Sequence, residues 1–202
     1  MNLFFDLDGT LLDARPRMYH LFQHLVPCSK LSFDDYWDLK RDKVSHELLL
    51  REKFGYSEEE IGEFAGKWMS RIEEPKWLSV DEPFEGVTDF LNKCSEKNRL
   101  YIVTARQFED RALWQIGKYD WYQYVNGVFV SNMPNGKYEL IRHLVEAGDR
   151  GWFIGDTGKD IETGKALGLK TAAVLSGFLS RKRLLEYHPD LIINTVINLV
   201  YE

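Results

Sequence analysis

Two aspartates near the amino terminus are the residues best suited to chemistry. Asp6 and Asp8 are separated by one residue, and Gly9 and the hydroxyl of Thr10 follow at once. Two carboxylates this close repel each other unless a cation or a shared proton lies between them. Asp-Gly is also an ordinary turn dipeptide, so the pair alone leaves a purely structural explanation open. The choice depends on whether the rest of the chain supplies partners for two carboxylates.

The residues before the pair predict the element that positions it. Apolar residues 3–5 run directly into Asp6, and a short apolar run that ends in a turn signal is typical of a buried strand. Open α/β sheets bind ligands beyond the carboxyl ends of their strands. We therefore expect Asp6 and Asp8 to lie just past the end of the first strand, where such ligands bind.

Composition limits the class of protein. The 202 residues suit one domain with a sizeable insertion or two small domains, and 44% hydrophobic residues suffice for a core. The net charge of −6 argues against a nucleic-acid partner. The chain starts without a basic, apolar leader, and no later run reaches membrane-spanning length. We therefore expect no membrane partner. Cys28 and Cys94 form neither a disulfide framework nor a metal-ligand spacing, which favours a reducing, cytoplasmic location.

A helical pattern without a convincing strand occupies residues 16–72. Pro16 suits the first turn of a helix. Ser57 and Glu60 have the spacing of a capping box, and the apolar residues that follow recur at the spacing of an amphipathic helix. We interpret residues 15–81 as a small helical insertion that divides the chain into 1–14 and 82–202.

Strands and helices alternate in the remainder. The pattern predicts strands at 99–104, 127–130, 151–155, 170–175 and 191–193, and helices at 109–119, 138–147 and 161–167. Such alternation implies a mostly parallel sheet with helices on both faces. The expected fold is therefore α/β, with a doubly wound, Rossmann-like core and an all-helical insertion after the first strand.

Three of the later strand ends carry the partners that an aspartate pair needs. Thr104 ends one predicted strand, Lys137 follows another, and Asp156 and Asp160 follow a third. Each has an ordinary explanation alone, as a strand residue, a solvated lysine at a helix start, or a helix cap. The order of acid pair, hydroxyl, lysine and acid pair, each after a strand, is much harder to obtain by accident.

These residues resemble the four signature motifs of the haloacid dehalogenase-like superfamily. The motifs are Asp6-Leu7-Asp8-Gly9-Thr10, Thr104, Lys137 and the run from Gly155 to Ile161 with Asp156 and Asp160. The helical insertion is similar to the cap of the branch that holds phosphoglycolate phosphatase and β-phosphoglucomutase. The resemblance spans the chain and implies a catalytic core at 1–14 and 82–202 and a cap at 15–81.

The resemblance implies a chemistry for these positions. Asp6 is expected to be the nucleophile that forms an aspartyl-phosphate from a phosphate monoester, which divides one difficult step into two easier ones. Asp8 is expected to give a proton to the leaving alkoxide and to take one from the attacking water. Lys137 would neutralise the nucleophile and a phosphoryl oxygen, and the Thr104 hydroxyl would donate to another oxygen.

The same resemblance implies Mg²⁺ as the cofactor, because an anionic nucleophile attacks an anionic ester only when the repulsion is cancelled. The expected ligands are Asp6, Asp156 and the backbone carbonyl of Asp8, with Asp160 holding a coordinated water or a ligand. Thr104, Ala105, Arg106 and Lys137 are the expected substrate-binding positions.

Two positions depart from the family pattern. The motif lysine is usually followed by proline, whereas Lys137 precedes Tyr138, which leaves Lys159 as a competitor for the catalytic role. Arg106 is charged where a small or polar residue is more usual. It has two interpretations, a contact with the substrate or the cap, and a salt bridge at the rim.

The leading prediction is a Mg²⁺-dependent phosphatase acting on a small phosphorylated metabolite, as a monomer or homodimer. Asp8 supports monoester chemistry, because dehalogenase members of the superfamily lack this acid. Two alternatives remain open. One is a sugar-phosphate mutase of the same fold, and the other is a binding or regulatory protein that retains the fold without the activity.

Overall fold

The computed structural model describes residues 1–133, 136–146 and 148–201. Contacts divide the chain into two compact units, of which the first comprises Met1–Asp13 and Glu82–Glu202 and the second comprises Ala14–Asp81. In the first unit, a six-stranded sheet contains β1 (Asn2–Phe5), β4 (Arg99–Thr104), β5 (Gly127–Val130), β6 (Gly151–Gly155), β7 (Lys170–Val174) and β8 (Leu191–Ile193). Its helices are α6 (Val87–Ser95), α7 (Glu109–Lys118), α8 (Gly136–Ile141), α9 (Gly158–Ala166) and α10 (Arg181–Leu185).

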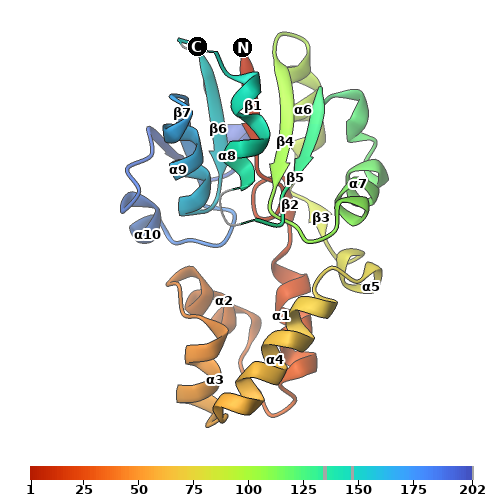
Figure 1. The fold of residues 1–202 in the computed structure, drawn as a ribbon, viewed down its shortest axis with the longest axis vertical. Coiled ribbons are helices and arrows are strands. Elements are labelled where there is room, and N and C mark those ends of the chain that lie inside the picture. Colours follow the sequence, from red (N-terminus) through yellow and green to blue (C-terminus); the bar gives the residue numbers. More distant parts are fainter. Residues whose placement is uncertain (134–135, 147, 202) are drawn as a thin grey trace. The chain divides into compact units, whose positions relative to one another are not determined.

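All six strands are parallel, in the order β5-β4-β1-β6-β7-β8 (Figure 1). The chain moves from β1 to β4 and β5 in one direction, then returns to β6 and continues the other way. The strand order therefore reverses between β1 and β6, which pair with Phe5 opposite Ile154. A reversal of this kind opens a crevice at the carboxyl ends of the strands, where doubly wound sheets bind their ligands.

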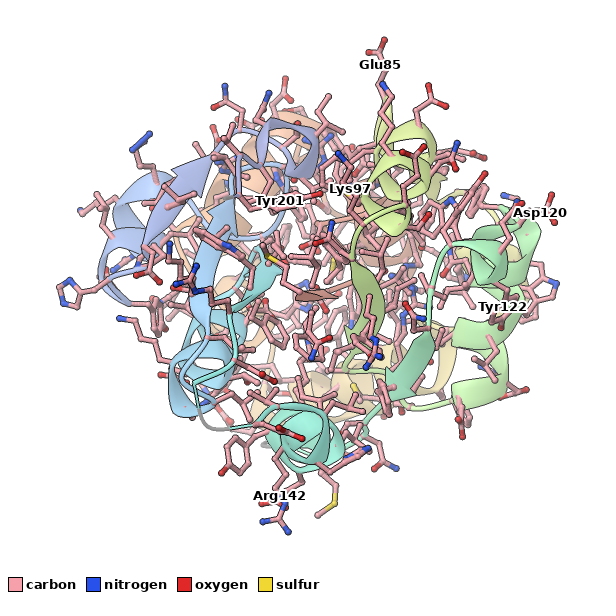
Figure 2. All side chains as sticks on the ribbon, turned by 90° about the horizontal axis from the view of Figure 1, so that it is seen from above. Glu85, Lys97, Asp120, Tyr122, Arg142 and Tyr201 are labelled. Atoms are coloured by element: carbon pink, nitrogen blue, oxygen red, sulfur yellow. The ribbon has the colours of Figure 1, made fainter. Side chains whose placement is uncertain are left out.

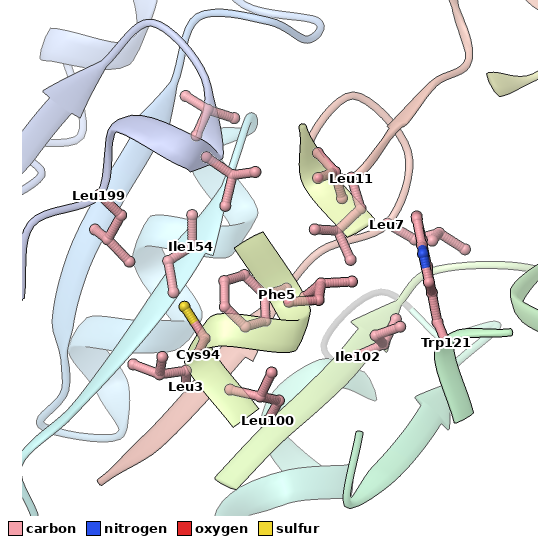
Figure 3. Close-up of a cluster of buried hydrophobic side chains, with 14 of the residues drawn as sticks. Leu3, Phe5, Leu7, Leu11, Cys94, Leu100, Ile102, Trp121, Ile154 and Leu199 are labelled. Atoms are coloured by element: carbon pink, nitrogen blue, oxygen red, sulfur yellow. The ribbon is translucent and has the colours of Figure 1, made fainter. Parts of the chain in front are cut away.

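Alternation along β1 sends side chains to both faces of the sheet. Leu3 and Phe5 pack with α6 and α7 in one buried cluster, part of which Figure 3 shows around Phe5. Phe4 packs on the other face in a cluster that contains Ile141 of α8. All three β1 side chains are fully buried, so the strand that precedes Asp6 is fixed by packing on both faces.

A short antiparallel ribbon lies where the chain leaves and re-enters the first unit. It pairs β2 (Leu12–Asp13) with β3 (Glu82–Pro83), and Leu12 lies opposite Pro83. Leu12 also forms an isolated bridge with Asp8, and its backbone carbonyl accepts a hydrogen bond from the amide of Gly9 at 2.7 Å. The ribbon thus ties the loop that contains Asp8 to the start of the excursion into the second unit.

The second unit is entirely helical among its assigned elements, which are α1 (Arg15–Leu25), α2 (Phe33–Arg41), α3 (His46–Phe54), α4 (Glu58–Arg71) and α5 (Pro75–Leu78). Phe22, Tyr36, Phe64 and Trp68 form an aromatic core around the ring of His46. The capping box predicted at Ser57 and Glu60 is present at the start of α4. A buried ion pair between Arg17 and Asp81, at 3.3 Å, joins the two ends of this unit.

The structure confirms the predicted α/β class and the parallel sheet. The strands predicted at 99–104, 127–130, 151–155 and 191–193 have these bounds, and the one predicted at 170–175 ends at Val174. The prediction of a helix at 138–147 was wrong at both its start and its end, because α8 begins at Gly136 and gives way at Arg142 to the 3₁₀ turn Arg142–Leu144. Residue 147 lies outside the described residues. In the part of the chain that is described, no helix is long and apolar enough to cross a bilayer.

Candidate active site

Three buried carboxylates meet at the reversal of the strand order. Asp6 follows β1, Asp156 follows β6, and Asp160 lies in the first turn of α9. One oxygen from each carboxylate lies within 4.8 Å of the others, and all three residues are buried. The amide of Asp6 donates to the carbonyl of Ile154 at 2.9 Å, which extends the β1–β6 ladder into the site. Acids 150 residues apart are thereby held by one pair of strands.

A single lysine bridges two of these carboxylates. The ammonium of Lys137, from the first turn of α8, lies 2.5 Å from Oδ1 of Asp6 and 2.6 Å from Oδ1 of Asp160. Its competitor Lys159 is 68% exposed and pairs with Glu162 at 3.0 Å. The structure therefore brings Lys137 to the acidic cluster and places Lys159 in an exposed ion pair.

The charges of the cluster do not balance. Among the residues that the structure describes, three carboxylates face one ammonium, which leaves two negative charges when all the acids are ionised. Burial raises the pKa of Asp6 to about 7, against the opposing effect of Lys137, and burial with the Asp6 charge raises the pKa of Asp156 well above 3.8. Burial lowers the pKa of Lys137, but the carboxylates of Asp160 and Asp6 outweigh this and raise it above 10.5. Full ionisation of the three acids is therefore unfavourable, and a bound cation would favour their ionised forms.

The donor set of the cluster fits a hard divalent cation. Oδ2 of Asp156 accepts a hydrogen bond from the amide of Phe178 at 2.6 Å, whereas its buried Oδ1 has no hydrogen-bond partner within the described ranges. Oδ2 of Asp160 accepts from the amide and hydroxyl of Thr157, which directs Oδ1 toward the cluster. Mg²⁺ and Ca²⁺ prefer carboxylate oxygens as ligands, whereas softer metals prefer thiolate or imidazole ligands. Three buried carboxylates, one with an oxygen that lacks a hydrogen-bond partner in the described part of the chain, therefore suit Mg²⁺ or Ca²⁺.

Two glycines leave the space that Asp156 occupies. Gly9 has a φ of +83°, and a Cβ at either Gly9 or Gly177 would collide with the Asp156 carboxylate. The hydroxyl of Ser176 donates to the carbonyl of Gly9 at 2.8 Å and so joins the loop after β7 to the loop after β1. The turn that the Asp-Gly dipeptide predicted is therefore also the point where a second loop approaches the acids.

Asp8 does not lie in the acidic cluster but in a two-point pair with Arg106. The guanidinium donates from Nε to Oδ2 at 2.8 Å and from Nη2 to Oδ1 at 2.6 Å. The same Nη2 donates to Oε1 of Gln115 at 2.8 Å. The arginine side chain is 2% exposed and that of Asp8 is 19% exposed, so the pair joins a buried guanidinium to a partly exposed carboxylate.

The remaining predicted positions come from the end of β4. Thr104 is buried there, in the strand next to β1, and Ala105 is exposed immediately after it. The amide of Ser131 donates to the carbonyl of Thr104 at 3.0 Å, and the amide of Arg106 donates to the carbonyl of Ser131 at 3.1 Å. These bonds fix the turn after β4 against the end of β5.

Sequence reasoning missed Gln115, the partner of Arg106. The signal for it was present, because Gln115 lies beside Ala112 and Ile116 on the buried face of α7, where a polar side chain requires a partner. The backbone amide of Phe178 was also missed as a donor to Asp156, since no residue type marks a backbone donor.

Comparisons with known proteins show which family and which solved structures the chain is similar to. The family model described as haloacid dehalogenase-like hydrolase matches residues 3–174, which is most of the chain. A phosphoglycolate phosphatase of Mesorhizobium japonicum is 22% identical over 94% of this chain and 88% of its own. Among solved structures, a haloacid dehalogenase-like family protein of Streptococcus pneumoniae is 24% identical and has a TM-score of 0.74, with 96% of this chain and 93% of that chain covered. A hydrolase of Pseudomonas syringae is 15% identical with a TM-score of 0.65, covering 96% and 94%.

Proposed function

Because the chain belongs to the haloacid dehalogenase-like hydrolases, we propose that it is a phosphatase that hydrolyses a small phosphate monoester through a covalent intermediate on Asp6. The observation that carries this proposal is the triad of Asp6, Asp156 and Asp160 bridged by Lys137. It combines a nucleophile, a fixed ammonium and oxygen ligands for a cation at the carboxyl ends of neighbouring strands.

Asp6 is the proposed nucleophile. One of its carboxylate oxygens forms a bond to phosphorus while the bond from phosphorus to the alcohol oxygen of the substrate breaks. Lys137 holds Oδ1 of Asp6 at 2.5 Å, so the carboxylate cannot rotate freely, and its ammonium offsets the charge that repels an incoming phosphate. Both effects favour attack by the carboxylate of Asp6, which burial makes costly to ionise.

Asp8 is the proposed proton carrier. It gives a proton to the departing alcohol oxygen and later takes one from the water that attacks phosphorus, which releases phosphate and restores Asp6. Its 19% exposed side chain fits this role, because the carboxylate is reachable from solvent while Asp6, Asp156 and Asp160 are more deeply buried.

Mg²⁺ is the proposed cofactor, held by Asp6, Asp156, the backbone carbonyl of Asp8 and Asp160. Bound there, it would supply positive charge to the phosphoryl oxygens in the transition state. The orphaned Oδ1 of Asp156 and the two uncompensated charges of the cluster support this assignment. The hydroxyl of Thr104 and the backbone that follows at Ala105 are the proposed donors to the remaining phosphoryl oxygens.

A phosphate-release screen tests the proposal. Purified protein with Mg²⁺ is incubated with sugar phosphates, nucleotides, pyrophosphate and 2-phosphoglycolate, the last because of the relative from Mesorhizobium japonicum. We expect release from at least one monoester, and loss of release in Asp6→Asn with the fold retained. Asp89→Asn, an exposed acid on α6, is the matched control and should keep full activity.

Two results would contradict the proposal. Substantial turnover by Asp6→Asn would exclude the covalent step through that residue. Conversion of a sugar 1-phosphate to its 6-phosphate without free phosphate would show a mutase instead of a hydrolase.

A further inference from the structure

We propose that Arg106 is a positioning residue that sets the orientation of the Asp8 carboxylate, and that Gln115 fixes Arg106 for this purpose. This inference rests on the proposed function, in which Asp8 carries the proton. It assigns a role to Arg106, whose charge the sequence alone attributes either to a contact with the substrate or the cap or to a salt bridge at the rim.

The first argument is geometric. Both oxygens of Asp8 accept from one planar guanidinium, at 2.8 and 2.6 Å. A two-point pair of this kind fixes the plane of the carboxylate as well as its distance, which a single hydrogen bond does not. Asp8 follows a strand but lies in a loop, so its orientation needs such a constraint.

The second argument is that Arg106 is itself fixed at both ends. Its amide donates to the carbonyl of Ser131 at 3.1 Å, which anchors the backbone to the end of β5. Its Nη2 donates to Oε1 of Gln115, a fully buried side chain of α7, at 2.8 Å. Three elements, β4, β5 and α7, therefore position one guanidinium, and this rigidity is transmitted to Asp8.

The third argument separates positioning from substrate binding. An arginine that bound the substrate directly would be expected to be the more accessible member of its ion pair. Here the exposures are reversed, because the side chain of Arg106 is 2% exposed and that of Asp8 is 19% exposed. The arginine thus lies behind Asp8 and acts through it, and the carboxylate is the group that a substrate meets.

A double-mutant cycle tests the proposal on a monoester that the screen identifies. Arg106→Met should lower kcat by about 10- to 100-fold, a part of the 10²–10⁴ that proton transfer contributes, while KM changes little. In an Asp8→Asn background, the same substitution should have almost no further effect on kcat, because the carboxylate that Arg106 is proposed to orient is gone. Arg106→Lys should recover part of the loss, since an ammonium makes one of the two contacts.

Gln115→Leu provides a second variant that leaves Arg106 in place, and it should lower kcat in the same direction by a smaller factor. Arg142→Met is the control, because Arg142 is 61% exposed, pairs only locally with Glu139 at 3.1 Å and points outward in Figure 2. The inference is overturned if Arg106→Met chiefly raises KM, which would show a substrate anchor. An equal loss of kcat in both backgrounds would overturn it as well.

A readout independent of activity covers a failure of the proposed function. In ¹⁵N spectra of the wild-type protein, the Nε–H of Arg106 should exchange slowly with solvent, and Asp8→Asn should accelerate this exchange. Arg142 gives the reference for an exposed arginine. If no monoester is hydrolysed but Asp8 protects the Nε–H of Arg106 from exchange, the proposed phosphatase activity is contradicted and the Arg106–Asp8 contact is confirmed. If the Nε–H exchanges like that of Arg142, the positioning role fails even in an active enzyme.

Discussion

Replacing Asp6 by asparagine should make the metal-free protein more stable at neutral and alkaline pH. Burial raises the pKa of Asp6 from 3.8 to about 7, so the folded protein keeps a proton that the unfolded chain has already lost. Where the folded state binds more protons, stability falls as pH rises. The contribution of Asp6 to the free energy of unfolding should therefore decrease from about pH 4 to about pH 7, and asparagine should remove this decrease.

The size of the effect follows from the shift in pKa. A rise from 3.8 to about 7 is roughly 3 pKa units, and at 1.36 kcal/mol per unit this corresponds to about 4 kcal/mol. Below pH 4 the neutral carboxyl resembles the amide, and the two proteins should have similar stability. Above pH 7, Asp6→Asn should exceed the wild type by about that amount, or on the order of 10 °C in melting temperature for a chain of this size.

Urea or thermal unfolding with a chelator present, at pH values from 4 to 8, measures the difference. Glu85→Gln is the matched control, because Glu85 is exposed and projects away from the molecule in Figure 2. Adding Mg²⁺ at 100 times its dissociation constant should stabilise the wild type by about 2.7 kcal/mol and Asp6→Asn by less. Parallel pH curves for the wild type and Asp6→Asn in the presence of the chelator would refute the idea that ionising Asp6 lowers the stability of the metal-free protein.

Three further results are expected. Lys137→Met should lower kcat by about 100-fold or more in a phosphate-release assay, as the loss of a charge-stabilising group does, whereas Lys159→Met should match the wild type; the reverse outcome would exchange their roles. Gly177→Ala should weaken Mg²⁺ binding in a calorimetric titration, because its Cβ displaces the Asp156 carboxylate; unchanged affinity would exclude Asp156 as a ligand. Mg²⁺ binding should strengthen as pH rises through about 7 and release protons in unbuffered solution, since the raised pKa values of Asp6 and Asp156 require ions to compete with protons; pH-independent affinity would contradict this.

The positions at the ends of strands were accessible to sequence reasoning. Apolar runs predicted β1, β4 and β6, and parallel strands bring their carboxyl ends to one edge, so Asp6, Thr104 and Asp156 were placed on the same side of the sheet without coordinates. Distances were not accessible. Whether Lys137 or Lys159 reaches Asp6 depends on the first turn of α8, whose start at Gly136 lies before the apolar pattern that predicted the helix.

The partners of Arg106 show a second limit. Periodicity identifies the buried face of α7 but not which buried polar groups meet across elements, so the contact of Gln115 with Arg106 required the structure. The ribbon of β2 and β3 was also absent from the prediction, because each strand has two residues and no pattern of period two can be read from them.

The packed core holds the three acids of the site together although their ionisation is unfavourable. A buried cluster of three acids with one ammonium is costly to ionise, since burial raises the pKa of both Asp6 and Asp156. It persists because the elements that hold it are packed on both sides, with Phe4, Phe5 and Ile154 fully buried and β1 paired to β6 up to the residue before Asp6. The core therefore maintains an arrangement of charge that is unfavourable alone, and a cation or a phosphoryl transition state is stabilised by relieving it.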